Sequence, residues 1–266
     1  MKNKKEKTFF YLFVIILIGL FCFGSIFPQK IGQIVKKEER NLTFPPIKNL
    51  EFPKIPLIDW EEKILQTTEN GFTIKEISGL TYIDNYLITN KTYSLPSSYE
   101  PQNTFMVING KNDCTQCMNI IVYRAFEKMK KAAQREGISL FIASGYRSYR
   151  KQQQLYQNYV NRDGKKSADR YSARPWNSEH QTSLAFDLNQ VSSEFEYTKA
   201  GKWLNQNAYK FWFILRYPKG KEDITGYMYE SWHFRYVWAD LSYKLFNNGN
   251  WIALEEYFGI TSKYEK

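Results

Sequence analysis

Only two histidines occur in the chain, and each has an acidic residue nearby in the sequence. Asp187 follows His180 by seven positions, and Glu230 precedes His233 by three. Catalytic zinc commonly takes three protein ligands and keeps a fourth position for water. Two imidazoles and one carboxylate meet that need, so we predict that His180, Asp187 and His233 bind Zn²⁺. Neither spacing is specific alone, since an isolated histidine is more often a buried polar residue than a ligand.

Zinc held by these residues would equip the chain for hydrolysis. The positive ion lowers the pKa of water in such a site toward ~7, and a general base must then accept the proton. Glu230 is the candidate base. If a turn or the start of a strand separates it from His233, its carboxylate can face the water without binding the metal.

Three separated motifs resemble those of the VanY-like D-alanyl-D-alanine carboxypeptidases and occur in the same order. They are SGYRSY at 144–149, SEHQT at 178–182 followed by Asp187, and ESWHFRY at 230–236. Further similarity lies in SARP at 172–175, FILRYP at 213–218 and ITGY at 224–227. The similarity covers roughly residues 85–258, and three motifs in the right order are a specific match.

The resemblance implies a zinc peptidase with His180, Asp187 and His233 as ligands and Glu230 as catalytic base. Its expected substrate is a bacterial peptidoglycan stem peptide that ends in D-Ala-D-Ala, from which it removes the last D-Ala. Three alternatives stay open: an LD-carboxypeptidase acting on tetrapeptides, a wall-binding module without turnover, and an endopeptidase of the phage-lysin type.

The resemblance also implies substrate contacts outside the metal site. Arg147 is expected to meet the substrate carboxylate or the polarised peptide carbonyl, because a guanidinium forms charge-assisted, bidentate hydrogen bonds. A structural ion pair is the alternative for Arg147. Gln152 and Ser178 match family positions that line the substrate site, although either residue could instead serve a turn or a helix cap.

Four positions depart from the family, which tends to have glycine at each of them. The chain has Trp176, Ser183, Trp212 and Trp238 there. Replacing glycine by tryptophan is drastic, because glycine marks a positive φ or a close backbone approach. One hypothesis is that the source organism reads UGA as glycine and that UGA was translated here as tryptophan. The competing interpretation is a subgroup with aromatic walls around a reshaped pocket.

An uncharged apolar stretch, Phe9 to Phe27, follows the lysines at positions 2, 4, 5 and 7. A run of this length can cross a bilayer as a helix, and flanking lysines hold that end in the cytoplasm. The stretch lacks a good cleavage site, so we expect a single-pass anchor in the cell membrane with residues 30–266 outside the cytoplasm. A buried soluble helix is the alternative.

The secondary-structure elements that we expect around the site indicate an α+β fold, in which helices flank a small antiparallel sheet. The expected transmembrane helix precedes this fold at the N-terminus. We expect an anchor at 1–29, an extracytoplasmic spacer at 30–71 and a catalytic domain at 72–266. Predicted strands are 82–89, 138–143, 184–188, 213–217 and 231–237. Predicted helices are 118–136, one capped by Ser148, 198–208, 238–247 and 252–258. The apolar spacing of the first helix runs through Ile121, Ala125, Met129 and Ala132.

The net charge and the cysteines limit which binding partners and which metal sites we expect. The formal net charge is +10, but no basic stripe is interleaved with aromatic residues, which argues against nucleic acid. The sequence has only one close pair of cysteines, Cys114 and Cys117, so a four-cysteine zinc site is excluded, and a local disulfide or two free thiols are the open interpretations. We expect a monomer.

Overall fold

An antiparallel four-stranded sheet places the strand that contains Asp187 beside the strand that contains His233 in the computed structural model of the chain. Its strands in spatial order are β7 (Ile142–Ser144), β8 (Ala185–Leu188), β10 (His233–Tyr236) and β9 (Phe213–Leu215). The β8 and β10 strands pair with His233 directly opposite Asp187. Because every residue of β8 and β10 is buried, their polar side chains must find partners inside the protein.

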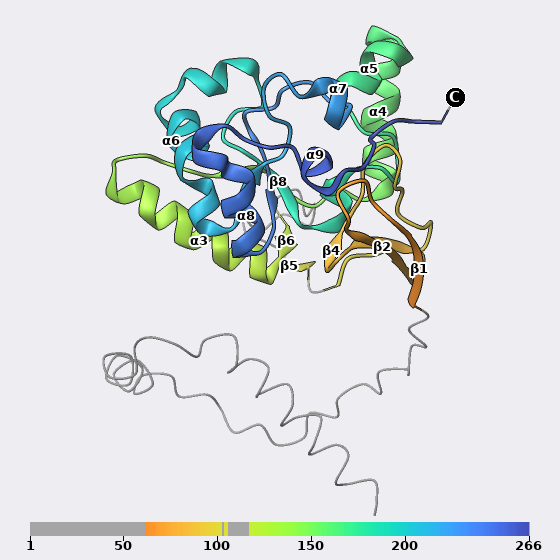
Figure 1. The fold of residues 1–266 in the computed structure, drawn as a ribbon. Coiled ribbons are helices and arrows are strands. Elements are labelled where there is room, and N and C mark those ends of the chain that lie inside the picture. Colours follow the sequence, from red (N-terminus) through yellow and green to blue (C-terminus); the bar gives the residue numbers. More distant parts are fainter. Residues whose placement is uncertain (1–61, 103, 106–116, 266) are drawn as a thin grey trace, which may run out of the picture. The chain divides into compact units, whose positions relative to one another are not determined.

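One face of this sheet packs on a group of helices. They are α3 (Ile120–Arg135), α6 (Lys199–Asn207), the 3-10 helix η4 (Ala208–Phe211) and α8 (Ala239–Phe246), and α3, α6 and α8 lie together in Figure 1. The Phe186 ring of β8 contacts Phe126 of α3 edge-on at 5.8 Å and Phe213 of β9 at 5.0 Å. The apolar core therefore lies on this side and leaves the polar residues of β8 and β10 to the other.

The α3 helix confirms the prediction for 118–136, with its apolar stripe rotated from the expected one. Its buried positions are Val122, Ala125, Phe126, Met129 and Ala133. The expected Ile121 is 45% exposed. Because apolar residues also lie on either side of the buried stripe, the sequence alone did not determine which helix positions face the core.

A second antiparallel sheet precedes the catalytic motifs. It consists of β1 (Glu62–Thr67), β2 (Thr73–Ile77), β3 (Leu80–Ile83) and β4 (Tyr86–Leu87), paired in chain order. The expected strand 82–89 is thus divided by a turn at Asp84, whose φ is 50°. Because β1 begins at Glu62, residues 62–71 form strand and turn where we expected spacer. A short antiparallel pair is formed by β5 (Thr104–Phe105) and β6 (Met118–Asn119).

Further helices of the described residues lie outside this group, and some of them contribute to the wall of the site. They are α4 (Tyr149–Asp163), α5 (Lys165–Tyr171), α7 (Glu222–Thr225), α9 (Leu254–Phe258) and the 3-10 helices η2 (Glu179–Thr182), η3 (Ser193–Tyr197) and η5 (Asn247–Gly249). As predicted, Ser148 caps α4, and its hydroxyl accepts a hydrogen bond from Lys151 N at 3.3 Å. The α4 and α5 helices pack on each other, away from α3 and α6 (Figure 1). The short helices α5 and α7 were not predicted.

The structure describes residues 62–102, 104–105 and 117–265, and the α+β class with small antiparallel sheets is confirmed there. Within these ranges, no helix combines the length and the apolar character that a bilayer crossing requires. The predicted span 9–27 and Cys114 lie outside them. Cys117 is buried and disulfide-bonded.

Three of the four positions that depart from the family have a left-handed backbone. The φ angles are 70° at Trp176, 60° at Ser183 and 71° at Trp212. Positive φ is rare for bulky residues and ordinary for glycine. Trp238, in contrast, has a φ of −75°. The backbone therefore explains a glycine preference at the first three positions, and it does not explain one at Trp238. Decoding of UGA as glycine stays a prediction.

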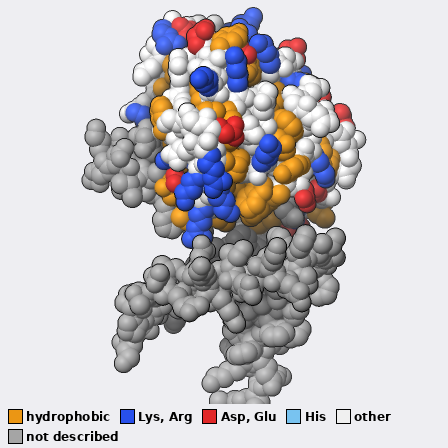
Figure 2. Space-filling model, turned by 90° about the vertical axis from the view of Figure 1, so that its left-hand side faces the viewer, with side chains coloured by type: hydrophobic (Ala, Val, Ile, Leu, Met, Phe, Trp, Pro, Cys, Tyr) orange, Lys and Arg blue, Asp and Glu red, His pale blue; other side chains and the backbone are white. Residues whose placement is uncertain are grey.

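One face of the described chain carries a basic patch. On the face drawn in Figure 2, lysine and arginine side chains gather in a patch beside hydrophobic ones, and acidic side chains are fewer. The carboxylates that matter for the site are instead buried, as the following contacts show.

Candidate metal centre and active site

The three predicted ligands meet at one point, although they come from separate elements. Asp187 lies on β8, His233 on β10 and His180 on η2, and one donor atom of each lies within 4.8 Å of the others. His180 Nε2 is 3.3 Å from Asp187 Oδ2, and His233 Nδ1 is 3.4 Å from Asp187 Oδ1. Ligands about 2.0–2.1 Å from a tetrahedral zinc ion are separated by roughly 3.3 Å. Each imidazole nitrogen therefore lies at such a distance from one of the two Asp187 oxygens, and the three side chains are close enough to share one metal ion.

A hydrogen bond leaves His180 one free nitrogen for the metal. His180 Nδ1 lies 2.7 Å from the carbonyl oxygen of Gly145, so the ring donates there and Nε2 is left as a ligand. His233 presents Nδ1 to the site instead. Asp187 Oδ1 is buried and lacks a hydrogen-bond partner within the described chain. Such an oxygen is costly to bury unless a cation or a donor occupies the space beside it.

The electrostatics of the centre favour a bound cation. Burial by itself lowers the pKa of His233, but the carboxylates of Asp187, Glu179 and Glu230 outweigh it and raise that pKa well above the ordinary value. Burial also raises the pKa of Asp187 by itself, yet the two histidines hold it below the usual range. Burial and then the Arg147 charge lower the pKa of His180. A group of carboxylates that stabilises a proton on His233 will also stabilise a metal ion in its place.

The Glu230 carboxylate lies beside the predicted metal ligands, as we expect of a general base. Its Oε2 is 3.3 Å from His233 Nδ1, on the side of the imidazole that faces the ligands. A turn separates the two residues, because His233 N donates to Glu230 O at 3.3 Å just before β10 begins. Burial is the main cause that raises the pKa of the Glu230 carboxyl. A raised pKa makes a carboxylate a better proton acceptor.

Arg147 reaches the same centre from the loop between β7 and α4. Its guanidinium donates to Gln152 Oε1 at 2.8 Å and to Ser144 Oγ at 3.2 Å. The contact with Asp187 Oδ2 is longer, 3.6 Å. Because its short contacts are with neutral groups, its positive charge is held in place without a close ion pair. This arrangement suits a substrate anion better than a purely structural ion pair does.

Gln152 and Ser178 differ in their relation to the site. Gln152 is fully buried, and its amide donates to Ala173 O at 2.6 Å while its oxygen accepts from Arg147. It is absent from the described residues that line the cavity, so its contact with the centre runs through Arg147. Ser178 lines the cavity, and its side chain does not cap η2.

A cavity of about 290 Å³ opens over the metal-binding atoms. Arg147, Glu230 and the three ligands lie in its wall. The rest of the lining is largely aromatic and aliphatic and includes Leu155, Tyr159, Tyr171, Val191, Met228 and Tyr229. A few convergent polar groups within apolar walls are typical of a site for a small ligand.

Sequence reasoning missed one carboxylate beside the centre. Glu179 was seen only as part of the motif at 178–182, but its Oε2 lies 3.6 Å from His233 Nε2. The signal available was its place between Ser178 and His180. That signal was insufficient, because the direction of its side chain depends on the 3-10 turn of η2.

Comparison with known proteins identifies the family. The family model described as "VanY: D-alanyl-D-alanine carboxypeptidase" matches residues 115–239. The putative carboxypeptidase YodJ of Bacillus subtilis (strain 168) is 39% identical over 204 residues, which cover 71% of this chain and 74% of that protein. The chain belongs to the VanY family. All three predicted ligands, Glu230 and Arg147 lie within the matched residues.

Solved structures of similar proteins add evidence on the identity of the metal. The LdcB LD-carboxypeptidase has 36% sequence identity and a TM-score of 0.62, with 76% of this chain and 100% of that chain covered. A mutant of the D,D-pentapeptidase VanY, solved in complex with Zn(II), has 31% identity and a TM-score of 0.55, with 64% and 96% covered. Together with the donor set formed by His180, Asp187 and His233, these findings make the chain a metallo-carboxypeptidase whose metal is zinc.

Proposed function

We propose that the chain removes the C-terminal D-Ala from peptidoglycan stem peptides that end in D-Ala-D-Ala. One observation carries this proposal: Glu230 and Arg147 both line the cavity that contains the three metal-binding residues. A carboxypeptidase needs a base for water, a cation for the free carboxylate of its substrate, and room for a small terminal residue. The cavity offers all three.

The roles of the side chains follow from their positions. Zinc, when bound, supplies Lewis acidity that polarises the peptide carbonyl and acidifies water. Glu230 accepts a proton from that water and delivers it to the nitrogen of the departing D-Ala. Arg147 donates hydrogen bonds to the substrate carboxylate or to the carbonyl oxygen as negative charge develops there. Gln152 and Ser144 keep the guanidinium in that direction.

A second substrate is favoured by a specific observation. The LdcB LD-carboxypeptidase matches at 36% identity and aligns over its whole chain. A tetrapeptide whose D-Ala follows an L-centre of a diamino acid is therefore the alternative. The aromatic and aliphatic walls that Tyr159, Tyr171 and Met228 form over the centre would contact the residue before the scissile bond.

Both substrates can be tested in one experiment. The zinc-loaded protein is incubated with a pentapeptide ending in D-Ala-D-Ala and, separately, with the tetrapeptide, and released D-Ala is followed by mass spectrometry. Faster release from the pentapeptide is expected, and faster release from the tetrapeptide would move the assignment to the alternative. Release from neither would overturn both and favour a wall-binding module.

We also propose that the protein is a single-pass membrane protein with its catalytic domain outside the cytoplasm, and that it acts as a monomer. Support comes from the apolar stretch 9–27 behind basic residues and from a substrate class that is found in the cell wall. Membrane fractionation with protease treatment of intact cells tests the first part. Digestion of the catalytic domain only after lysis would contradict it. Light scattering of the purified protein tests the second.

A further inference from the structure

Glu179 is buried beside the metal centre, and its two carboxylate oxygens have different surroundings. Its side chain is 1% exposed. Oε1 accepts hydrogen bonds from Arg216 Nε at 2.7 Å and from Arg235 Nη1 at 3.0 Å. Oε2 instead faces His233 Nε2 at 3.6 Å. One oxygen thus belongs to a buried ionic network, and the other is directed at a predicted zinc ligand.

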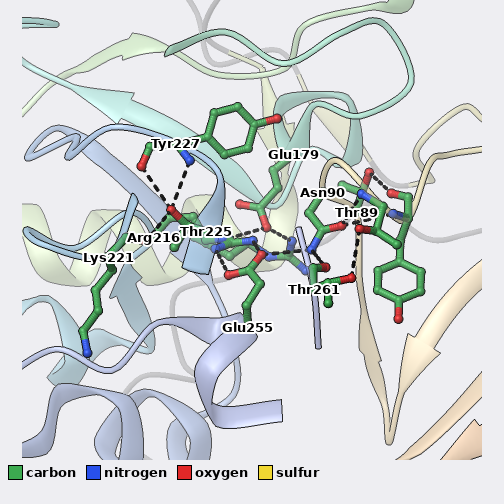
Figure 3. A network of polar contacts seen from close by, with 12 residues as sticks. Thr89, Asn90, Glu179, Arg216, Lys221, Thr225, Tyr227, Glu255 and Thr261 are labelled. Carbon is green, nitrogen blue, oxygen red and sulfur yellow. Dashed lines mark hydrogen bonds and ion pairs between the residues drawn. The ribbon is translucent and has the colours of Figure 1, made fainter. Parts of the chain in front are cut away.

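The two arginines are themselves fixed by other groups. Arg216 donates from Nη1 and Nη2 to both oxygens of Glu255, at 2.8 and 2.7 Å (Figure 3). Arg235 donates to the backbone oxygens of Leu87 at 2.8 Å and Tyr236 at 3.0 Å. With two carboxylates against two guanidiniums, this buried group is balanced in charge. A balanced and well-bonded network can hold its members rigidly inside a protein.

The carboxylate oxygen of Glu179 and the imidazole nitrogen of His233 that face each other are both incompletely hydrogen-bonded. Glu179 Oε2 and His233 Nε2 are each buried without a hydrogen-bond partner in the described part of the chain. A neutral imidazole that binds a metal through Nδ1 must carry its proton on Nε2, and such a proton is usually donated to a carboxylate, a carbonyl or water. The 3.6 Å separation exceeds a typical N–H···O hydrogen bond by about 0.7 Å, so a small ring movement closes it.

We propose that Glu179 is a positioning residue that sets the tautomer and orientation of His233, with Arg216 and Arg235 holding its carboxylate in place. The Nε2–H of His233 donates to Glu179 Oε2, and Nδ1 is thereby left as the ligand atom. The inference deepens the proposed zinc chemistry and rests on it. Glu179 also lies in the wall of the cavity, but the role proposed for it is exerted through His233.

Two substitutions of the same kind test the proposal in the full-length protein. Glu179→Gln removes the charge that faces His233, whereas the matched control Glu255→Gln removes a charge from the same Arg216 without contacting a ligand. The dissociation constant for Zn²⁺ is measured by competition with a chromogenic chelator. The visible spectrum of the Co²⁺-substituted protein reports on ligand geometry, and thermal melts report on folding.

Glu179→Gln is expected to weaken zinc binding by about 10- to 100-fold and to change the Co²⁺ spectrum. Glu255→Gln should leave both within about twofold, even where it lowers the melting temperature. Equal weakening by both variants, or an unchanged zinc affinity in Glu179→Gln, would overturn the proposal. If Glu179→Gln does not fold, Glu179→Asp keeps the charge for the arginines but shortens the side chain, and it must weaken zinc binding by more than about tenfold.

The outcome is independent of turnover. If the parent protein binds zinc and releases no D-Ala, the proposed function fails while the zinc affinities still decide the role of Glu179. If the parent protein binds no zinc, both fail. A crystal structure of the zinc-loaded protein adds a direct check, because Nε2 of His233 must then lie within hydrogen-bond distance of Glu179 Oε2.

Discussion

Gln152 accepts a hydrogen bond from the Arg147 guanidinium at 2.8 Å and anchors its own amide on the backbone of Ala173. The cation expected to bind substrate is thus oriented by a neutral, fully buried side chain on α4. A neutral partner fixes the direction of the guanidinium and leaves its charge available to an anion. This relationship leads to the first prediction.

Gln152→Ala should lower kcat/KM by about 10- to 100-fold, because a small displacement of a substrate-orienting group is costly. Zinc affinity should stay unchanged, since Gln152 contacts none of the ligands. The exposed neighbour Gln153 offers a matched control, and Gln153→Ala should retain parent kinetics. Parent kinetics for Gln152→Ala as well would show that Arg147 does not depend on this contact.

Glu230→Gln should reduce kcat by about 10²- to 10⁴-fold, the usual contribution of a general base. The variant keeps the size of the side chain, so zinc should still bind, which equilibrium dialysis can verify. Glu222→Gln, on the surface and paired with Arg170, is the control and should retain activity. Loss of zinc together with activity would instead make Glu230 a ligand.

Removal of zinc should destabilise the protein. Zinc at 100 times its dissociation constant adds about 2.7 kcal/mol to the free energy of unfolding. In His180→Ala the same zinc concentration should add much less, because one of three ligands is gone. Denaturant titrations with and without chelator measure both values. An equal gain in the two proteins would place the zinc elsewhere.

Acid should destabilise the metal-free protein partly through Glu179. Burial alone raises the pKa of this carboxyl, but Arg216 and Arg235 hold it far below the ordinary 4.5. The unfolded chain therefore binds more protons than the folded one as pH falls below about 4.5, and the free energy of unfolding decreases. Chemical denaturation at pH 5 and pH 3 measures the decrease. Glu179→Gln should show a smaller one, and an equal decrease in both proteins would exclude this cause.

The sequence could predict the group formed by His180, Asp187 and His233 because histidine is scarce and the motifs are local. It also predicted the strand that contains Asp187 and the strand that contains His233. Their pairing in register could not be predicted, because each strand is only four residues long and nothing in the sequence says which residue of one strand lies opposite which residue of the other. The direction of the Glu179 side chain depends on contacts with Arg216 and Arg235. Both residues are distant in sequence, so no local sequence pattern could reveal that direction.

The left-handed backbone at Trp176 and Trp212 has a practical consequence for recombinant production. If the coding DNA reads UGA at these positions, an ordinary expression host ends translation at codon 176, before the first metal ligand. The truncated product would contain none of the three ligands and would be inactive for a reason unrelated to its chemistry. A synthetic gene with glycine codons at 176 and 212 would then restore the protein. UGG codons in the source DNA would instead establish both tryptophans as genuine.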